Sequence, residues 1–306
     1  MRRARAAVGI LAVLIVAGCG GGTTPAAGHH RGEPSASHPR NSAPRSPSPG
    51  SASPRAQPPK PAAAPATAVI SQFRALDGSV ITLATFSGGV VFRLHGGSQD
   101  PGYPALSSLH GGPVIADGER RRLLAAFNGG FQLSGGAGGY EQEGRIVSPL
   151  VPGLASLVID RSGAAVIGVW GRGLARPGGA AQSVRQNLSP LVRHGQVAPI
   201  AADWQLWGAT LGGGEFVARS ALGQDAAGRL IFAGSMSASP VALGAALVHA
   251  GARIAMELDI NPMWVQLDVA RHPGHQLTAA IPGQQRPADQ YLFGWTRDFI
   301  TVLTTP

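Results

Sequence analysis

The chain has 306 residues with 25 Lys and Arg against 16 Asp and Glu, a formal net charge of +9 that is unevenly placed. Eight of the basic residues lie in the first 60 positions, so the residues after 66 hold 17 basic and 15 acidic side chains and are close to neutral. A nucleic-acid-binding protein concentrates cationic side chains on its folded surface, which this distribution does not support. The single Cys, Cys19, excludes disulfide frameworks and zinc sites built from several Cys ligands.

The first 18 residues predict an export signal. Three Arg residues precede an apolar run from Val8 to Ala17, and this run is about half as long as a membrane-spanning helix requires. It ends at Val16-Ala17-Gly18-Cys19, which resembles the cleavage box of bacterial lipoproteins, in which the Cys becomes the lipidated first residue of the mature chain. We therefore expect a lipid anchor at Cys19. The alternative is an ordinary or uncleaved signal with a free thiol.

Residues 19–67 predict a disordered tether. From Gly20 to Thr67 there is no Val, Ile, Leu, Met, Phe, Tyr or Trp, while 11 Pro residues stand among Ser, Ala and Gly. Such a segment buries too little apolar surface to offset its chain entropy, and its Pro content keeps it extended. It can therefore hold a folded domain away from a membrane surface. We interpret its three His residues as bystanders rather than as metal ligands.

Residues 68–306 are predicted to fold as one domain, because a segment of this length suffices for a substantial core. Runs of β-branched and aromatic residues, divided by turn residues, predict a β-meander at its start and hairpins further on. In chain order, the expected elements are strands 69–75, 80–86 and 90–95, a helical turn within 116–122, a strand at 123–127, a hairpin of 155–160 with 164–170, and a hairpin of 191–194 with 196–200.

A β-α-β unit is the clearest pattern in the second half of the chain. A strand at 229–233 is followed by Ser239 as helix cap, Pro240 at the first helical position, an apolar helix over 241–250, Gly251 as terminator and a strand at 254–260. The right-handed crossover rule makes the two strands parallel. Together with the hairpins, this predicts an α+β fold class, a single domain built on a mixed, mostly antiparallel β-sheet.

Two carboxylates in the last of these strands are the first candidates for chemistry. The period of two along a strand puts the apolar residues of 256–260 on one face and Glu257 and Asp259 on the other. Same-face neighbours stand about 7 Å apart, near the separation at which paired carboxylates act on a glycosidic bond. Crowding of the like charges would raise the pKa of one of them. The alternative is structural, a buried ion pair with Arg219 or Arg253.

Further candidates lie in glycine-rich or turn segments. An Arg such as Arg219, just before a strand, is suited to binding phosphate or carboxylate as a fork, although a single Arg is more often a surface residue. Glycine clusters usually mark turns, and an aromatic side chain is more often core than a sugar platform. The oxygen ligands of Asp259, Glu257 and Asn261 suit a divalent cation, but no spacing requires one, and no other cofactor is expected. Candidate substrate contacts are Asn128, Gly129, Gly130, Tyr140, Glu143, Arg145, Asn261 and Trp264.

Four motifs occur in an order that resembles the phosphodiester glycosidase family. They are Ala125–Phe131, Ala155–Asp160, Arg219–Gly223 with Gly228–Phe232, and Gly251–Asp259, and the resemblance spans about residues 69 to 300. The family includes the lysosomal enzyme that uncovers mannose 6-phosphate by removing N-acetylglucosamine, and bacterial exopolysaccharide-related proteins. Many members follow the aspartate with a glycine run, whereas Ile260–Trp264 follows here. The resemblance implies places in an active-site cleft for Asn128, Gly129, Gly130, Arg219 and Asp259.

These features predict a lipid-anchored hydrolase on the outer face of the cytoplasmic membrane, with its folded domain in the cell wall or periplasmic space. It is expected to cleave a sugar-1-phosphodiester or related linkage of an envelope polysaccharide. In this hypothesis Arg219 neutralises the phosphate, Asn128 holds substrate oxygens, and Asp259 with Glu257 transfers protons or stabilises positive charge at the anomeric carbon. The expected partners are the glycan and the membrane, without nucleic acid, and the chain is expected to be a monomer. The alternatives are a non-catalytic glycan-binding lipoprotein of the envelope and a two-lobed solute receptor.

Overall fold

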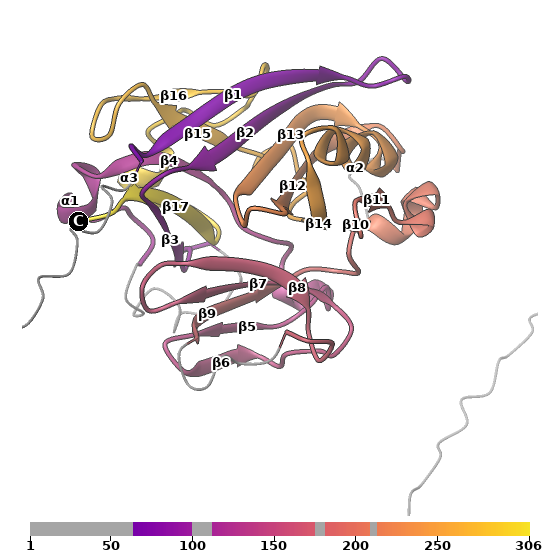
Figure 1. Cartoon of the computed structure of the whole chain (residues 1–306), viewed down its shortest axis with the longest axis horizontal. Helices are drawn as coiled ribbons and strands as arrows, with labels where there is room; N and C mark the ends of the chain where they lie inside the picture. Colours follow the sequence, from indigo (N-terminus) through magenta and orange to yellow (C-terminus); the bar gives the residue numbers. More distant parts are fainter. Residues whose placement is uncertain (1–63, 100–111, 175–180, 209–212) are drawn as a thin grey trace, which may run out of the picture. The chain divides into compact units, whose positions relative to one another are not determined.

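The computed structural model describes residues 64–99, 112–174, 181–208 and 213–306, which all lie within the compact unit Pro59–Pro306 (Figure 1). The predicted signal (1–18), the lipidated Cys19 and nearly all of the tether (19–67) fall outside the described residues, so they stay predictions. The first strand begins at Thr67, one residue before the predicted start of the domain. No helix of the described residues has the length and apolar character that a membrane span requires.

The described strands form three sheets, and the first has the order β1-β2-β13-β12-β14-β10-β11, with each strand antiparallel to its neighbour. The predicted pairing of 69–75 with 80–86 is confirmed as β1 with β2, and that of 191–194 with 196–200 as β10 with β11. The bounds are β1 (Thr67–Arg74), β2 (Val80–Ser87), β10 (Val192–Arg193), β11 (Gln196–Val197), β12 (Val217–Asp225), β13 (Leu230–Ala238) and β14 (Ala252–Glu257).

The second sheet has the order β16-β15-β4-β17-β3. Its last strand corrects the predicted meander, because β3 does not continue beside β2 but pairs with β17, with Phe299 opposite His95. This pairing joins the two ends of the domain, which a local pattern of residues cannot reveal. The bounds are β3 (Val90–His95), β4 (Leu123–Asn128), β15 (Leu267–Ala270), β16 (Leu277–Ala279) and β17 (Phe299–Thr304).

The third sheet has the order β6-β5-β9-β7-β8 and is drawn below the other two in Figure 1. Its β7–β8 hairpin is the predicted one, and the turn uses Gly163 at φ 85°. The strands β5, β6 and β9 were not predicted. The bounds are β5 (Tyr140–Gln142), β6 (Arg145–Ser148), β7 (Ala155–Asp160), β8 (Ala165–Val169) and β9 (Ala181–Gln186).

The predicted β-α-β unit is formed by β13, α2 and β14. Ser239 caps α2 as expected, since its Oγ accepts the N–H of Ala242 at 3.1 Å. Both strands are antiparallel to β12, so they run in the same direction, but β12 lies between them. Every ladder of the described residues is therefore antiparallel, and the expected mixed pairing does not occur. The helices are α1 (Asp117–Arg120), α2 (Pro240–His249) and α3 (Gln290–Phe293), with 3-10 turns η2 (Leu133–Gly135), η3 (Pro199–Ala202) and η4 (Trp204–Trp207).

Alternate residues of the central strands face different cores. On β13, Phe232 packs into the core that the three sheets share, whereas Ile231 and Ala233 pack with residues of α2. On β4, Phe127 enters the shared core while Ala126 faces the opposite side of its sheet. Because a packed core deforms little, the ends of β4, β14 and β17 are held in fixed positions relative to one another.

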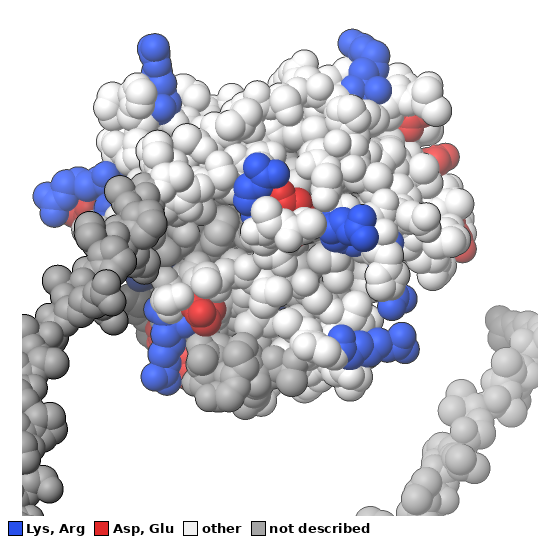
Figure 2. All heavy atoms as spheres, viewed as in Figure 1, with Lys and Arg blue, Asp and Glu red and all other residues white. Residues whose placement is uncertain are grey.

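Basic side chains are scattered on the face of the molecule drawn in Figure 2, where the blue groups stand apart and some lie beside red acidic ones. Two further Arg side chains, Arg185 and Arg219, are buried in ion pairs. The described residues on this face form no continuous cationic stripe of the kind that phosphate backbones require, in line with the near-neutral charge of the domain.

Candidate functional site

A small pocket lies where β4 ends, the chain leaves β14 and β17 begins. Its volume of about 10 Å³ is the space of roughly one water molecule. The backbone N–H of Gly129 donates to the Asp298 carbonyl at 2.7 Å, and that of Asn128 to the Gln266 carbonyl at 3.3 Å, so these segments are closed onto one another. The pocket is lined by Asn128, Gly129, Asp259, Trp264, Gln266, Gln290, Tyr291, Thr296, Arg297 and Asp298.

Asp259 is the pocket's most constrained carboxylate. Its Oδ1 accepts the backbone N–H groups of Ile260 at 2.7 Å and Asn261 at 2.9 Å, and its Oδ2 pairs with Arg297 Nη1 at 2.6 Å. Burial raises the pKa of Asp259 to about 6, while Arg297 and the two N–H donors lower it in part. Burial is the main cause of this raised pKa. The sequence had predicted a different cause, crowding by the charge of Glu257. A carboxylate that titrates near 6 can accept a proton close to neutral pH.

Asp298 borders the pocket beside Asp259. Its Oδ2 accepts Arg185 Nε at 2.7 Å and the N–H of Gly130 at 3.3 Å, whereas its buried Oδ1 has no hydrogen-bond partner among the described residues. A Cβ at Gly129 would lie 2.1 Å from Asp298 Oδ2. Gly129 and Gly130 therefore make room for Asp298 and its Arg partner, which is a role inside the protein rather than a contact with a ligand.

Asn128 links two strands at the base of the pocket. Its Nδ2 donates to Ser220 Oγ at 2.8 Å, and its Oδ1 accepts the N–H of Gln266 at 3.1 Å. Ser220 Oγ in turn accepts the N–H of Asp259 at 3.1 Å. Because both ends of the Asn128 amide are engaged, its main effect is to fix the segment that carries Asp259.

Arg219 and Glu257 form a second ion pair that lies outside the pocket lining. Arg219 Nη1 is 2.7 Å from Glu257 Oε1, and both side chains are completely buried. Other Arg219 donors bond to the carbonyls of Ala238 and Trp207 at 3.1 Å. Burial raises the pKa of Glu257 to about 8, and the Arg219 guanidinium lowers it only in part. This is the structural alternative foreseen for Glu257, and Arg219 has no open surface through which to bind a phosphate.

Three other predicted residues lie apart from the pocket. Tyr140 is buried, and its hydroxyl donates to Gln142 Oε1 at 2.7 Å. The Arg185 guanidinium lies 5.8 Å from the centre of its ring, so Tyr140 supports Arg185 by packing. Glu143 and Arg145 are exposed at the turn between β5 and β6 in the third sheet. The structure thus brings Asn128, Gly129, Asp259 and Trp264 together and leaves Tyr140, Glu143 and Arg145 outside the pocket lining.

Sequence reasoning missed Arg185, Arg297 and Asp298. A signal existed for two of them: Arg297 and Asp298 directly precede the apolar strand β17, and charged residues are buried at such a position only when they are paired. It missed Asn187 as well, whose Nδ2 donates to the Glu257 and Leu258 carbonyls at 2.8 and 2.9 Å and so holds the end of β14.

The predicted oxygen ligands for a cation are not gathered around one point. Glu257 faces Arg219 and Asp259 faces Arg297, while Asn261 Oδ1 accepts the N–H of Met263 at 3.0 Å. Among the described residues, no group of three or more His, Cys, Asp or Glu side chains is arranged to hold a metal ion.

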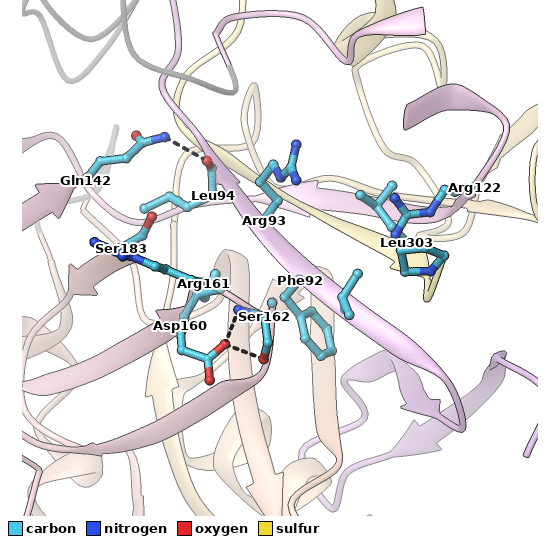
Figure 3. A pocket seen from close by; sticks show the side chains of 14 residues that line it. Phe92, Arg93, Leu94, Arg122, Gln142, Asp160, Arg161, Ser162, Ser183 and Leu303 are labelled. Atoms are coloured by element: carbon cyan, nitrogen blue, oxygen red, sulfur yellow. Dashed lines mark hydrogen bonds between the residues drawn. The ribbon is translucent and has the colours of Figure 1, made fainter. Parts of the chain in front are cut away.

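A larger pocket of about 190 Å³ lies between β3, the end of β17 and the β7–β8 turn, and Figure 3 shows the residues that line it. Two of its three cationic side chains are engaged by the protein: Arg93 pairs with Glu119, and Arg122 Nε donates to the Thr304 carbonyl at 2.8 Å. The third, Arg161, is exposed. The acid in its lining, Asp160, caps its own turn through the N–H and hydroxyl of Ser162. This pocket is roomier than the first but lacks a comparable buried acid–base arrangement within its described lining.

Comparisons with known proteins reveal only distant likenesses. No family model matches the chain, and no curated protein matches it. Among solved structures, it is similar to the catalytic domain of zebrafish N-acetylglucosamine-1-phosphodiester alpha-N-acetylglucosaminidase, auto-inhibited by its pro-peptide, with 14% identity, a TM-score of 0.48 and coverage of 81% of this chain and 85% of that one. A hypothetical protein from Synechocystis shares 12% identity at a TM-score of 0.45, covering 79% of this chain and 64% of that one. These are distant likenesses of fold and carry nothing about activity.

Proposed function

We propose that this chain is a hydrolase that cleaves the bond between the sugar C1 and the phosphate oxygen of a saccharide phosphodiester. The ordered motifs that resemble the phosphodiester glycosidase family support the class of reaction. One observation supports the site: Asp259, buried and held by Arg297, borders a space for about one water. A carboxylate whose pKa lies near 6 is suited to take a proton from that water.

The leaving group explains why a single carboxylate suffices. Water attacks the anomeric carbon, the C1–O bond breaks, and the electron pair of that bond leaves on a phosphate oxygen. A phosphate monoester is already an anion at neutral pH, so its departure needs no protonation by a second acid. One proton of the water passes to Asp259, and the sugar keeps the new hydroxyl. Glu257 is then free to be structural, as its sealed pair with Arg219 indicates.

The remaining side chains have distinct roles in this proposal. Arg297 orients Asp259 through the 2.6 Å contact, and Oδ1 of Asp298, which has no partner among the described residues, accepts a hydrogen bond from the attacking water. Asn128 acts as a positioning residue, since it reaches Asp259 through Ser220. We assign no substrate contact to Arg219.

The cellular setting is part of the same proposal. The signal at 1–18, the Cys19 box and the Pro-rich tether support a lipoprotein anchored on the outer face of the cytoplasmic membrane. The tether lets the domain reach polysaccharide of the cell envelope as a monomer.

A non-catalytic glycan-binding lipoprotein is the second candidate. The replacement of the family's glycine run by Ile260–Trp264 favours it. A sugar ring does not fit into about 10 Å³, so either candidate must hold its sugar outside the pocket. In the hydrolase proposal the ring lies at the mouth of the pocket, and only its C1 faces Asp259.

Release of free sugar distinguishes the two candidates. The full-length chain is incubated with methyl phosphodiesters of several sugar 1-phosphates, and binding and product are both followed. We expect the wild-type chain to release sugar and Asp259→Asn to release about a thousandfold less. Asp117→Asn is the matched control, because its side chain is 92% exposed and lies outside the pocket lining, and it is expected to retain activity. Binding by all three chains without release would overturn the hydrolase and support the binding protein.

A further inference from the structure

The segment that distinguishes this chain from many phosphodiester glycosidases, Ile260–Trp264, forms a compact turn at the mouth of the pocket. The Asn261 carbonyl accepts the N–H groups of Trp264 at 2.8 Å and Val265 at 3.0 Å. Together with the bonds from Ile260 and Asn261 to Asp259 Oδ1, this turn fixes where Trp264 stands. The turn thereby holds Trp264 in the pocket lining. Two sets of hydrogen bonds, those to Asp259 Oδ1 and those to the Asn261 carbonyl, connect Trp264 to the proposed base.

Trp264 is one wall of a cluster with Trp295 and Arg286. The two indole rings have centroids 5.6 Å apart at 42°. The Arg286 guanidinium carbon lies 4.8 Å from the centroid of Trp264 and 4.1 Å from that of Trp295, so the cation lies against both rings. The side chains come from three separate segments, yet they meet beside one pocket.

The cluster is tied to the pocket through the residues that line both. Gln290 Nε2 donates to the carbonyls of Gly294 at 2.6 Å and Trp295 at 3.3 Å, and Gln266 Nε2 donates to the Pro287 carbonyl at 3.2 Å. Gln266 and Gln290 are both pocket residues. The position of Arg286 and Trp295 is therefore coupled to the walls around Asp259.

Trp295 is held in an uncommon way. It adopts φ 56°, in the left-handed region that a bulky side chain rarely enters, and its residue remains 50% exposed. Backbone strain of this kind persists where the surrounding structure enforces it, and it is concentrated at ligand-binding positions. The strain presents a large aromatic face to solvent next to a cation.

Arg286 has a charge that no acid neutralises within the described chain. Its Nε donates to the Met263 carbonyl at 3.1 Å, but it forms no ion pair with a described carboxylate, and its buried Nη2 has no hydrogen-bond partner there. Buried donors without a partner are rare in folded proteins. With Nε engaged and Nη2 buried, Nη1 is the nitrogen left to meet a phosphate, and the stacked guanidinium brings its positive charge there.

We propose that Arg286, Trp264 and Trp295 form a subsite for a saccharide phosphodiester at the mouth of the pocket. Arg286 binds the phosphodiester anion, and the exposed face of Trp295 stacks against the sugar. This inference rests on the proposed function, which it deepens by assigning the phosphate contact to Arg286 in place of Arg219. It also gives the Ile260–Trp264 segment a purpose, since that segment carries one wall of the subsite.

The test measures binding without turnover. The probes are methyl esters of C-glycosyl phosphonates, in which a carbon replaces the bridging oxygen so that no hydrolysis can occur. Glucose, galactose, mannose and N-acetylglucosamine forms of both anomers are titrated calorimetrically into the full-length chain, each beside the neutral methyl C-glycoside. We expect at least one phosphonate to bind, and Arg286→Gln to weaken it by about tenfold or more while the neutral glycoside changes less than twofold.

Two further variants separate the parts of the subsite. Arg286→Lys keeps the charge but loses the planar group that stacks on the two indole rings, so its affinity is expected to fall between those of wild type and Arg286→Gln. Trp295→Ala is expected to weaken charged and neutral ligands alike by about fivefold. Phe293→Ala is the matched control, because Phe293 is an exposed aromatic of the same segment, 75% accessible, that makes no ring contact with Arg286. Thermal unfolding of each variant establishes that it is folded.

Three results would overturn the subsite: no phosphonate binds, Arg286→Gln affects neutral and charged ligands equally, or Phe293→Ala costs as much as Trp295→Ala. These outcomes are independent of catalysis. Phosphodiester hydrolysis with an unchanged KM in Arg286→Gln would contradict the proposed subsite and support the proposed hydrolase activity. Phosphonate binding that depends on Arg286, in a chain that releases no sugar, would keep the subsite and remove the hydrolase.

Discussion

Two ion pairs at the end of β14 differ in what surrounds them. Arg219–Glu257 and Arg297–Asp259 have nearly equal N–O distances of 2.7 and 2.6 Å, and their acids are two residues apart in the chain. The first pair is sealed between strands of one sheet, whereas the second borders the pocket where two sheets meet. The comparison teaches that side-chain alternation places two acids on one side of a strand but does not place them in one site, because the strand ends between them.

Neutralising each acid in turn is the strongest test of the difference between the two ion pairs. Asp259→Asn removes the proposed base and is expected to lower kcat by about a thousandfold. Glu257→Gln is expected to keep kcat within about fivefold, because Glu257 lies outside the pocket lining and faces Arg219. Steady-state kinetics of both variants on the same phosphodiester measure the difference. Equal losses in both variants would show that the two acids act as one pair.

The sealed pair is expected to act on stability. Arg219→Met leaves Glu257 buried without a cation, which costs about 3–5 kcal/mol in the free energy of unfolding. Adding Glu257→Leu in the same chain removes the buried acid and is expected to restore most of that loss. Denaturant unfolding of the single and double variants tests this, and a double variant that is less stable than Arg219→Met would count against a structural role for the pair.

Stability is also expected to depend on pH through buried acids. Burial raises the pKa of Asp268 to about 8, although amide groups of Gln266 and Gln284 hydrogen-bond it at 2.6 and 2.7 Å. Between pH 4 and 8 the native state holds this proton and the unfolded chain does not. The free energy of unfolding therefore falls as the pH rises through this window, by about 1.4 kcal/mol per pH unit for such a group.

Asp268→Asn removes the contribution of that residue to the slope of the free energy of unfolding against pH. Unfolding curves at pH 5, 6, 7 and 8 measure it in both chains. We expect a shallower decline in the variant, so an unchanged slope would show that Asp268 does not hold its proton in the native state.

The smallest expected effect concerns the pH dependence of activity. A base must be deprotonated to act, and the pKa of Asp259 is raised to about 6. We expect kcat to rise about tenfold per pH unit below 6 and to level off above it. Kinetics between pH 4.5 and 7.5 check this limb. A limb that falls with rising pH through 6 would instead assign Asp259 the role of a proton donor.

Patterns of neighbouring residues predicted the elements whose interacting residues lie close together in the chain. The cap at Ser239, the helix after it and the β7–β8 hairpin follow from neighbouring residues, and the structure confirms them. The place of β3 was mispredicted because its partner β17 lies at the other end of the domain. The pairing of β17 with β4, which sets Phe299 opposite Asn128, brings Arg297 and Asp298 to the pocket, so these two members of the candidate site were invisible to motif reasoning.

The role of Arg219 could not be predicted from the sequence for a different reason. The sequence placed Arg219 before a strand, whereas it lies within β12. Either position is compatible with a ligand contact or a buried pair, and burial decides between them. Only the structure shows that Glu257 and the carbonyls of Ala238 and Trp207 take up its donors. The signal and nearly all of the tether lie outside the described residues, and their roles stay predictions.

The origin of the oxygen in the released sugar tests the central claim most directly. The full-length chain hydrolyses a sugar phosphodiester in water enriched in oxygen-18, and both products are analysed by mass spectrometry. Attack on the anomeric carbon by a water held at Asp259 predicts that the heavy oxygen appears in the C1 hydroxyl of the sugar and not in the phosphate monoester. Heavy oxygen in the phosphate would place the attack at phosphorus and contradict the account.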